Sequence, residues 1–109
     1  MAEDESFLRR LSERIPRFEW DESKRRSNVV KHGIDFSDAT EAFYDPAAFT
    51  LRSPHPASER RYVTVGLVRG ALIAVIFTIR GEAIRIISAR AARRGERQTY
   101  GAAAEKKTQ

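Results

Sequence analysis

The chain has 109 residues, the size of one ordinary domain, and contains no cysteine. Charged residues make up 32% of it, and its longest apolar run, residues 71–77, is far shorter than the roughly 18 residues of a transmembrane helix. These values exclude a membrane-spanning helix, a disulfide framework and a thiolate metal site. The net charge of +5 is typical of a small domain that binds nucleic acid, an acidic protein or an anionic membrane surface.

The first sixteen residues are predicted to be an appendage to the domain. Four apolar residues between Phe7 and Ile15 have the spacing of a short amphipathic helix, which Pro16 would end. The segment is either a docked helix or partly disordered. The acidic start of the sequence has no apolar segment behind it, so we expect no secretory signal and a cytoplasmic location.

A short strand and a helix are predicted at the beginning of the domain. Residues 17–20 alternate between polar and apolar side chains, as in a strand. Asp21 is a typical N-cap for a helix that runs to about His32, and Gly33 suits the position just after its end.

The rest of the sequence predicts an antiparallel meander between two further helices. The elements are, in order, a short helix from Asp35 or Ser37 to before Asp45, a loop over 52–58, strands over 61–67, 71–79 and 83–90, a helix over 91–100 and a flexible tail over 101–109. Short connections with glycine join the three strands. The fold class is therefore α+β, with one domain over residues 17–100.

One group of polar residues lies on the first predicted helix. Lys24, Asn28, Lys31 and His32 are at positions i, i+4, i+7 and i+8, which places them on one helix face. A stripe of cations with an amide and a histidine suits phosphate recognition, although a solvated helix face has the same pattern.

A second group lies on the last strand and helix. Its members are Arg85, Arg90, Arg93, Arg94 and Arg97, with Glu96 and Tyr100 beside them. Arg85 points away from the face of its apolar neighbours, so it either pairs with an acid or lines a cleft, because an unpaired buried arginine is costly. The alternative for the helix is a charged face in solvent.

The other residue types and motifs of the sequence limit the reactions that the protein can catalyse. Two isolated histidines and the absence of a glycine-rich loop leave metal catalysis and nucleotide-cofactor binding without a motif, and Ser88 lacks the context of a nucleophile elbow. Arginine, lysine, histidine and tyrosine are sufficient for RNA cleavage by the RNA's own 2′-hydroxyl. The protein then deprotonates that hydroxyl, stabilises the phosphorane and protonates the leaving oxygen. We expect no cofactor.

A set of short motifs carries a family resemblance. They are Trp20-Asp21, Lys24, Asn28, Lys31-His32-Gly33, Phe36, Ala39, Phe43, Asp45-Pro46, Glu59-Arg60, Arg85-Ile-Ile-Ser-Ala-Arg90, Glu96 and Tyr100. Over residues 17–100 they resemble the BrnT toxins of bacterial type II toxin–antitoxin systems. The resemblance implies a RelE-like fold and a cytoplasmic, metal-independent endoribonuclease that inhibits translation. It also implies a BrnA-like ribbon-helix-helix antitoxin, in a heterotetramer that binds its own operator DNA through the antitoxin.

The chemistry and the resemblance together predict the site. The candidate catalytic residues are Lys24, His32, Glu59, Arg85, Arg90 and Tyr100, and the candidate RNA-binding residues are Asn28, Lys31, Arg60, Arg93, Arg94 and Arg97. His32 is the candidate acid or base, because histidine transfers protons near neutral pH. Lys24 and Arg90 would hold the scissile phosphate, with support from Arg85.

The other two catalytic candidates have open roles. Tyr100 is a second candidate for proton transfer, or a base-stacking residue, and Glu59 would act as a base or orient Arg60. Two other classes of function use the same residues. One is a non-catalytic, basic nucleic-acid-binding module, and the other is an interaction domain whose basic face docks an acidic partner.

Overall fold

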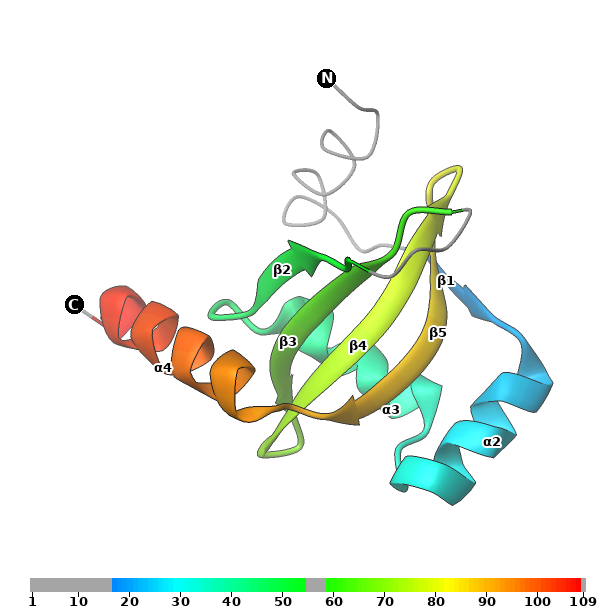
Figure 1. Ribbon diagram of the computed structural model, residues 1–109, viewed down its shortest axis with the longest axis horizontal. Coiled ribbons are helices and arrows are strands. Elements are labelled where there is room, and N and C mark those ends of the chain that lie inside the picture. Colours follow the sequence, from blue (N-terminus) through cyan, green and yellow to red (C-terminus); the bar gives the residue numbers. More distant parts are fainter. Residues whose placement is uncertain (1–16, 55–58, 109) are drawn as a thin grey trace.

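The computed structural model describes residues 17–54 and 59–108, and the predicted appendage lies outside them. Five strands form one sheet of order β1-β5-β4-β3-β2 (Figure 1). They are β1 (Arg17–Trp20), β2 (Phe49–Arg52), β3 (Tyr62–Val68), β4 (Ala71–Arg80) and β5 (Ala83–Ala91). The helices are α2 (Glu22–His32), α3 (Phe36–Ala39), the 3-10 helix η1 (Thr40–Tyr44) and α4 (Arg94–Thr108). The predicted α+β class is confirmed, and no helix in the described ranges is long and apolar enough to cross a bilayer.

The strands of the sheet are joined in two ways. β3, β4 and β5 form the predicted antiparallel meander, and β2 extends it by pairing antiparallel with β3. β1 instead pairs in parallel with β5, with Arg17 opposite Ala83. The sheet is therefore mixed, with β1 and β2 at its two edges.

Helix α2 begins and ends where its sequence predicts. The Oδ1 atom of Asp21 accepts hydrogen bonds from the N–H groups of Ser23 and Lys24, at 2.9 and 3.1 Å, and so caps the helix. Gly33 ends it with a φ of 70°, a left-handed conformation that glycine adopts without strain.

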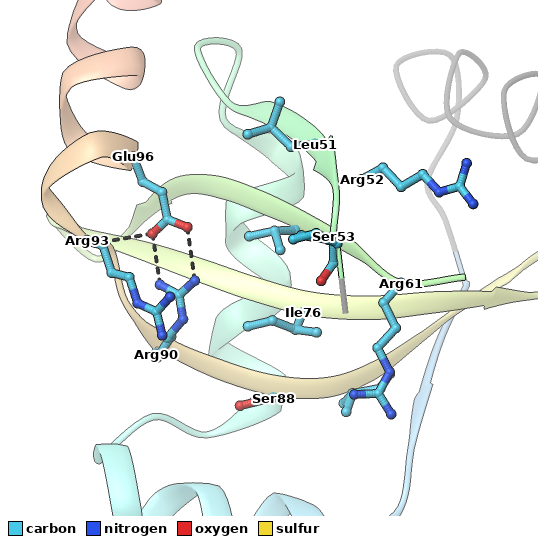
Figure 2. A pocket seen from close by; sticks show the side chains of 12 residues that line it. Leu51, Arg52, Ser53, Arg61, Ile76, Ser88, Arg90, Arg93 and Glu96 are labelled. Carbon is cyan, nitrogen blue, oxygen red and sulfur yellow. Dashed lines mark hydrogen bonds and ion pairs between the residues drawn. The ribbon is translucent and has the colours of Figure 1, made fainter. Parts of the chain in front are cut away.

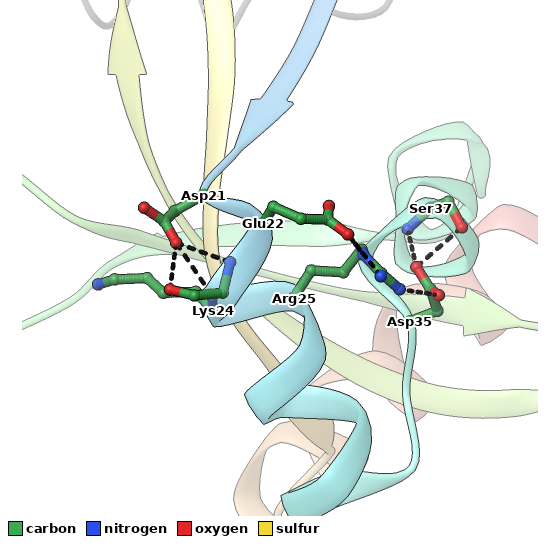
Figure 3. A network of polar contacts seen from close by, with 7 residues as sticks. Asp21, Glu22, Lys24, Arg25, Asp35 and Ser37 are labelled. Atoms are coloured by element: carbon green, nitrogen blue, oxygen red, sulfur yellow. Dashed lines mark hydrogen bonds and ion pairs between the residues drawn. The ribbon is translucent and has the colours of Figure 1, made fainter.

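Arg25 joins α2 to α3 (Figure 3). Its guanidinium donates to Glu22 at 2.6 Å and to Asp35 at 2.8 Å. The second carboxylate oxygen of Asp35 accepts from the backbone N–H of Ser37 at 3.0 Å and caps α3. The same side chain therefore fixes the start of α3 and its position relative to α2.

The main core lies between the sheet and the helices α3 and η1. Phe36, Phe77, Ile84 and Ile86 are its largest fully buried apolar side chains. At Gly66, η1 lies close to β3: a Cβ atom there would be 2.6 Å from the carbonyl oxygen of Ala42. The small residue on the strand thus sets how near the helical layer can lie.

A β-bulge interrupts the pairing of β4 with β5. Ile76 is opposite Ser88 and Phe77 is opposite Ile86, so Ile87 is an extra residue between the two pairs. In a regular strand, consecutive side chains point to opposite faces. Because of the bulge, Ile87 and Ser88 both line the open face of the sheet.

Two elements differ from the sequence prediction. Strand β2 was not predicted, and Arg52 belongs to it although the sequence predicts a loop there. Helix α4 starts at Arg94 and continues to Thr108, where the sequence predicts a flexible tail. The helix starts later than predicted because Ala91 still belongs to β5. It ends later because the alanine, glutamate and lysine residues after Gly101 have high helix propensity.

Candidate functional site

The face of the sheet opposite α3 and η1 carries a groove of about 530 Å³ (Figure 2). Helix α4 covers the neighbouring part of this face, where Tyr100 packs near Val65 and Ala74. The residues that line the groove are Leu51, Arg52, Ser53, Pro54, Arg61, Val63, Ile76, Ile87, Ser88, Arg90, Arg93 and Glu96. They come from β2 to the first turn of α4, so one continuous half of the chain builds the groove.

The groove combines an apolar floor with cations at both ends. Val63 and Ile76 are opposite each other on β3 and β4 and form the middle of the floor. Figure 2 shows Arg61 at one end and Arg90 and Arg93 at the other. An apolar surface between guanidinium groups suits a ligand with a flat apolar part and anionic groups beside it.

Glu96 fixes the position of Arg90. The two side chains form a bidentate ion pair with N–O distances of 2.8 and 2.9 Å, and they are only 17% and 18% exposed. Glu96 also accepts the backbone N–H of Arg93 at 2.8 Å and thereby caps α4. The hydrogen bond from Arg90 lowers the pKa of Glu96, so the carboxylate is ionised at neutral pH and offsets part of the positive charge.

Arg61 is a groove residue that was not predicted from the sequence. Its Nε atom is buried and, within the part of the chain that the structure describes, has no hydrogen-bond partner. The predicted residue, Arg60, is exposed and outside the groove lining, and its carbonyl accepts the hydroxyl of Thr78 at 2.7 Å. Arg61 is two positions before Val63, so the alternation of a strand places both side chains on the same face of the sheet. This spacing distinguishes Arg61 from Arg60 in the sequence.

The side chain of Asn28 serves the fold. It is 5% exposed, and its Nδ2 donates to the carbonyls of Ala89 and Ile34 at 2.8 and 2.9 Å. Its Oδ1 accepts the N–H of Ala89 at 3.1 Å and the hydroxyl of Ser88 at 3.2 Å. Both donors and both lone pairs are thus used within the protein, which gives Asn28 a structural role, and its predicted contact with RNA stays a prediction.

The cations of α2 border the edge of β5. Lys24 and His32 lie one helical turn before and after Asn28, and both are exposed, as is Lys31. Since Asn28 is bonded to Ala89, the helix face with Lys24 and His32 lies beside β5, the strand that contributes residues 87, 88 and 90 to the groove lining. None of the three cations is among the residues that line the groove.

Two other predicted catalytic residues are held by ion pairs. Arg85 forms an ion pair with Glu19 of β1 at 3.0 Å. Of the two alternatives that the sequence left open, an acidic partner or a place in a cleft, the first is therefore the one observed. Glu59 faces Arg80 at 3.8 Å, and both side chains are well exposed to solvent. The contact of Glu59 is of a kind that contributes little energy, and neither Arg85 nor Glu59 lines the groove.

Tyr100 anchors α4 to the body of the domain. Its hydroxyl donates to Asp45 at 2.8 Å, and Asp45 also accepts the backbone N–H groups of Leu67 and Ala47. Burial and the bond to Asp45 raise the pKa of Tyr100 to about 12. This tyrosine is outside the groove lining, and so are Arg94 and Arg97, which lie on α4.

Comparison with known protein families gives a match. The family described as the ribonuclease toxin BrnT of type II toxin–antitoxin systems matches residues 20–96. This range contains every residue that lines the groove. No curated protein matches the chain. Members of this family are ribonuclease toxins that work with an antitoxin. The match covers well over half of the sequence, and the chain belongs to the BrnT family.

Proposed function

We propose that this chain is an endoribonuclease that binds and cleaves RNA in the groove on the open face of its sheet. The observation that carries the proposal is the apolar floor of Val63 and Ile76 between Arg61 and the Arg90–Arg93 end. A base or ribose can lie on the floor while backbone phosphates contact the guanidinium groups. The family match supports this at the level of a ribonuclease toxin.

The proposed reaction is metal-independent attack by the 2′-hydroxyl on the adjacent phosphorus. The O2′–P bond forms as the P–O5′ bond breaks, which leaves a 2′,3′-cyclic phosphate and a 5′-hydroxyl. The fixed guanidinium groups of the groove would stabilise the charge of the phosphorane, the part that a metal ion has in other nucleases. Glu96 is the carboxylate of the groove lining, and it is already bound to Arg90.

The proton transfers are proposed to involve the cations beside β5. Lys24 and His32 are exposed on α2 outside the groove lining, so this role requires the scissile phosphate to lie at the border of the groove beside β5 and α2. His32 remains the candidate acid or base. Tyr100 and Glu59 are weaker candidates, because Tyr100 is bonded to Asp45 and Glu59 lies near Arg80.

The antitoxin is proposed to be a BrnA-like ribbon-helix-helix protein. It would cover the cationic groove with acidic side chains, and a heterotetramer of the two proteins would bind operator DNA through the antitoxin. The physical support is the net charge of +5, with Arg61 and Arg93 in the groove lining, which an acidic segment neutralises. Cleavage of cytoplasmic RNA would then inhibit translation when the antitoxin is lost.

The test is to incubate purified, antitoxin-free protein with RNA in the presence of EDTA and to analyse the new ends. Cyclic phosphate and 5′-hydroxyl ends are expected. Intact RNA, or cleavage that EDTA abolishes, contradicts the proposed reaction.

The same assay tests the site. Lys24→Ala, His32→Ala and Arg90→Ala should each lower the cleavage rate by about 10²–10³ and relieve growth arrest. Arg26→Ala is the matched control, because Arg26 is an exposed cation of α2 outside the predicted stripe. Removal of Arg90 leaves Glu96 without its ion-pair partner, so the double variant Arg90→Ala with Glu96→Gln is compared as well. Folded variants that remain fully toxic exclude those residues from the site.

A further inference from the structure

The arginines around the groove differ in what already binds them. Arg90 is held at both terminal nitrogens by Glu96, and Arg85 is held by Glu19. Arg61 has a buried Nε atom with no hydrogen-bond partner among the described residues. Arg52 and Arg93 also line the groove and have no side-chain partner among the described residues, but both are exposed to solvent. Arg61 is thus the half-buried arginine of the lining whose side chain the described fold leaves unbound.

An unused N–H of this kind needs an explanation. A buried donor without an acceptor is unfavourable, and the penalty is larger when the group is charged. Figure 2 shows that the guanidinium of Arg61 extends from the start of β3 across the groove to the side of β5, far from Glu96. The terminal nitrogens of the same guanidinium are not among the buried atoms and have no partner among the described residues, so a ligand in the groove that Arg61 lines can bind them. Because guanidinium is planar and always charged, it binds phosphate and carboxylate groups through two parallel hydrogen bonds, and the RNA of the proposed function supplies phosphate.

We infer that Arg61 is the primary phosphate-binding residue of the groove, and that Arg90, already paired with Glu96, is secondary. The inference rests on the proposed function and makes it more specific, because it sets the direction in which RNA is held. One backbone phosphate binds at Arg61, and the adjoining nucleoside lies on the floor of Val63 and Ile76 toward Arg90.

An exposed arginine of α2 provides a matched control. Arg26 carries the same charge as Arg61 and lies outside the groove lining and outside the predicted stripe. Arg26→Ala and Arg61→Ala therefore change the net charge equally but alter different surfaces. Any effect of overall charge on RNA binding will be the same in both variants.

The experiment measures binding of a 2′-O-methyl RNA oligonucleotide, which lacks the attacking hydroxyl, at several salt concentrations. Arg61→Ala should weaken binding about ten- to a hundredfold and reduce the slope of log affinity against log salt by about 0.7, the value for one lost single-strand phosphate contact. Arg61→Lys should recover part of the affinity, because it keeps the charge but loses the planar fork. Arg26→Ala should bind nearly as well as the wild type. Equal losses in the two alanine variants overturn the inference.

The thermal stability of an Arg61 variant distinguishes a binding role of this residue from a structural one. Arg61→Met removes the unpartnered donor but keeps an unbranched side chain. Because nothing in the described fold is bonded to Nε, the thermal unfolding midpoint should stay the same or rise while oligonucleotide affinity falls. A lowered midpoint shows that Arg61 supports the fold and contradicts the inference.

Cleavage of unmodified RNA separates this inference from the proposed function. If wild-type protein binds the oligonucleotide through Arg61 but never cleaves RNA, the ribonuclease proposal fails and the phosphate site stands. If wild-type protein cleaves RNA and Arg61→Ala binds and cleaves equally well, the phosphate site fails and the ribonuclease proposal stands.

Discussion

The side chain of Asn28 does for β5 what a neighbouring strand would do. β1 ends at Trp20, opposite Ile86, and the backbone groups of Ala89 lie beyond that end. The Asn28 amide donates to the carbonyl of Ala89 and accepts its N–H, as the backbone of a paired strand does. Buried backbone groups that are left unpaired are costly, so this side chain stabilises the edge of the sheet.

Replacement of this amide should destabilise the protein. Asn28→Ala leaves buried groups of Ala89 unpaired and should lower the free energy of unfolding by about 1–3 kcal/mol, measured by urea denaturation. Ser27→Ala, at the adjacent exposed position, should change it by no more than about 0.5 kcal/mol. An Asn28→Ala variant with unchanged stability but weakened RNA binding would restore the interpretation of this residue as an RNA contact.

Tyr100 allows an anchoring role to be separated from a catalytic one. Tyr100→Phe keeps the ring that packs beside Val65 and removes only the hydrogen bond to Asp45. The free energy of unfolding should fall by about 1–2 kcal/mol while the RNA cleavage rate stays within about twofold of wild type. Tyr44→Phe is the control, since Tyr44 is 53% exposed. A stable Tyr100→Phe variant without cleavage activity would show a catalytic role instead.

At the scale of elements, α4 is attached to the domain through two carboxylates. Glu96 joins the first turn of the helix to Arg90, and Asp45 binds Tyr100 further along it. The hydrogen bond from Arg90 lowers the pKa of Glu96. Burial opposes ionisation of Asp45, but hydrogen bonds from Leu67, Ala47 and Tyr100 together lower its pKa as well.

This attachment predicts a loss of stability in acid. A group whose pKa is lower in the folded state stabilises the fold above its unfolded pKa, and this contribution is lost as the pH falls through the folded value. The ordinary values are 4.5 for Glu96 and 3.8 for Asp45, so the free energy of unfolding should decrease below about pH 4.5. Glu96→Gln should show a shallower decrease. Identical profiles for wild type and Glu96→Gln from about pH 7 to about pH 3 would contradict this account.

The spacing between β3 and η1 gives a prediction about packing. Gly66→Ala places a Cβ atom 2.6 Å from the backbone oxygen of Ala42, so the helical layer must shift. The free energy of unfolding should fall by about 1–3 kcal/mol, as for other overpacked cores. Gly95→Ala is the opposite control. Apart from its chain neighbours and the backbone of its own helix, no atom of the described residues lies within 4 Å of the new methyl group, so the variant should gain about 0.4–1 kcal/mol in stability. Equal effects of the two substitutions in denaturation experiments would exclude the close approach as the cause.

At the scale of the whole molecule, the proposed antitoxin should be attracted by the cations of the groove and α4. Arg94→Glu with Arg97→Glu reverses two charges on α4 without changing the groove lining. This variant should bind the antitoxin more slowly, with a smaller change in dissociation rate, and the difference should shrink as salt is added. Surface plasmon resonance at low and high salt measures both rates. An unchanged association rate would place the partner on another surface.

The regular elements were easier to predict from the sequence than the site. Asp21 and Gly33 mark the limits of α2 because their caps act locally, and glycine turns mark the meander. β2 was missed because its four residues pair with β3 across a loop, which leaves no local pattern. Helical spacing placed Asn28 among cations correctly, but only the position of β5 shows that its amide is bonded to Ala89. Likewise, the alternation of the strand places Arg61 on the same face as Val63, but only the structure shows that this face is the open one.

The parallel pairing of β1 with β5 sets the order in which the molecule can be completed during synthesis. Glu19 and Arg85, which pair across these strands, are separated by 66 positions in the chain. β1 and α2 are therefore made first but have no strand to join until β5 follows, whereas β3, β4 and β5 pair with their immediate neighbours. A chain that ends before Ala83 has neither a partner for β1 nor the Arg90 end of the groove. Under the proposed function, the nascent chain therefore cannot cleave RNA at the ribosome that makes it until β5 and the start of α4 have been synthesised.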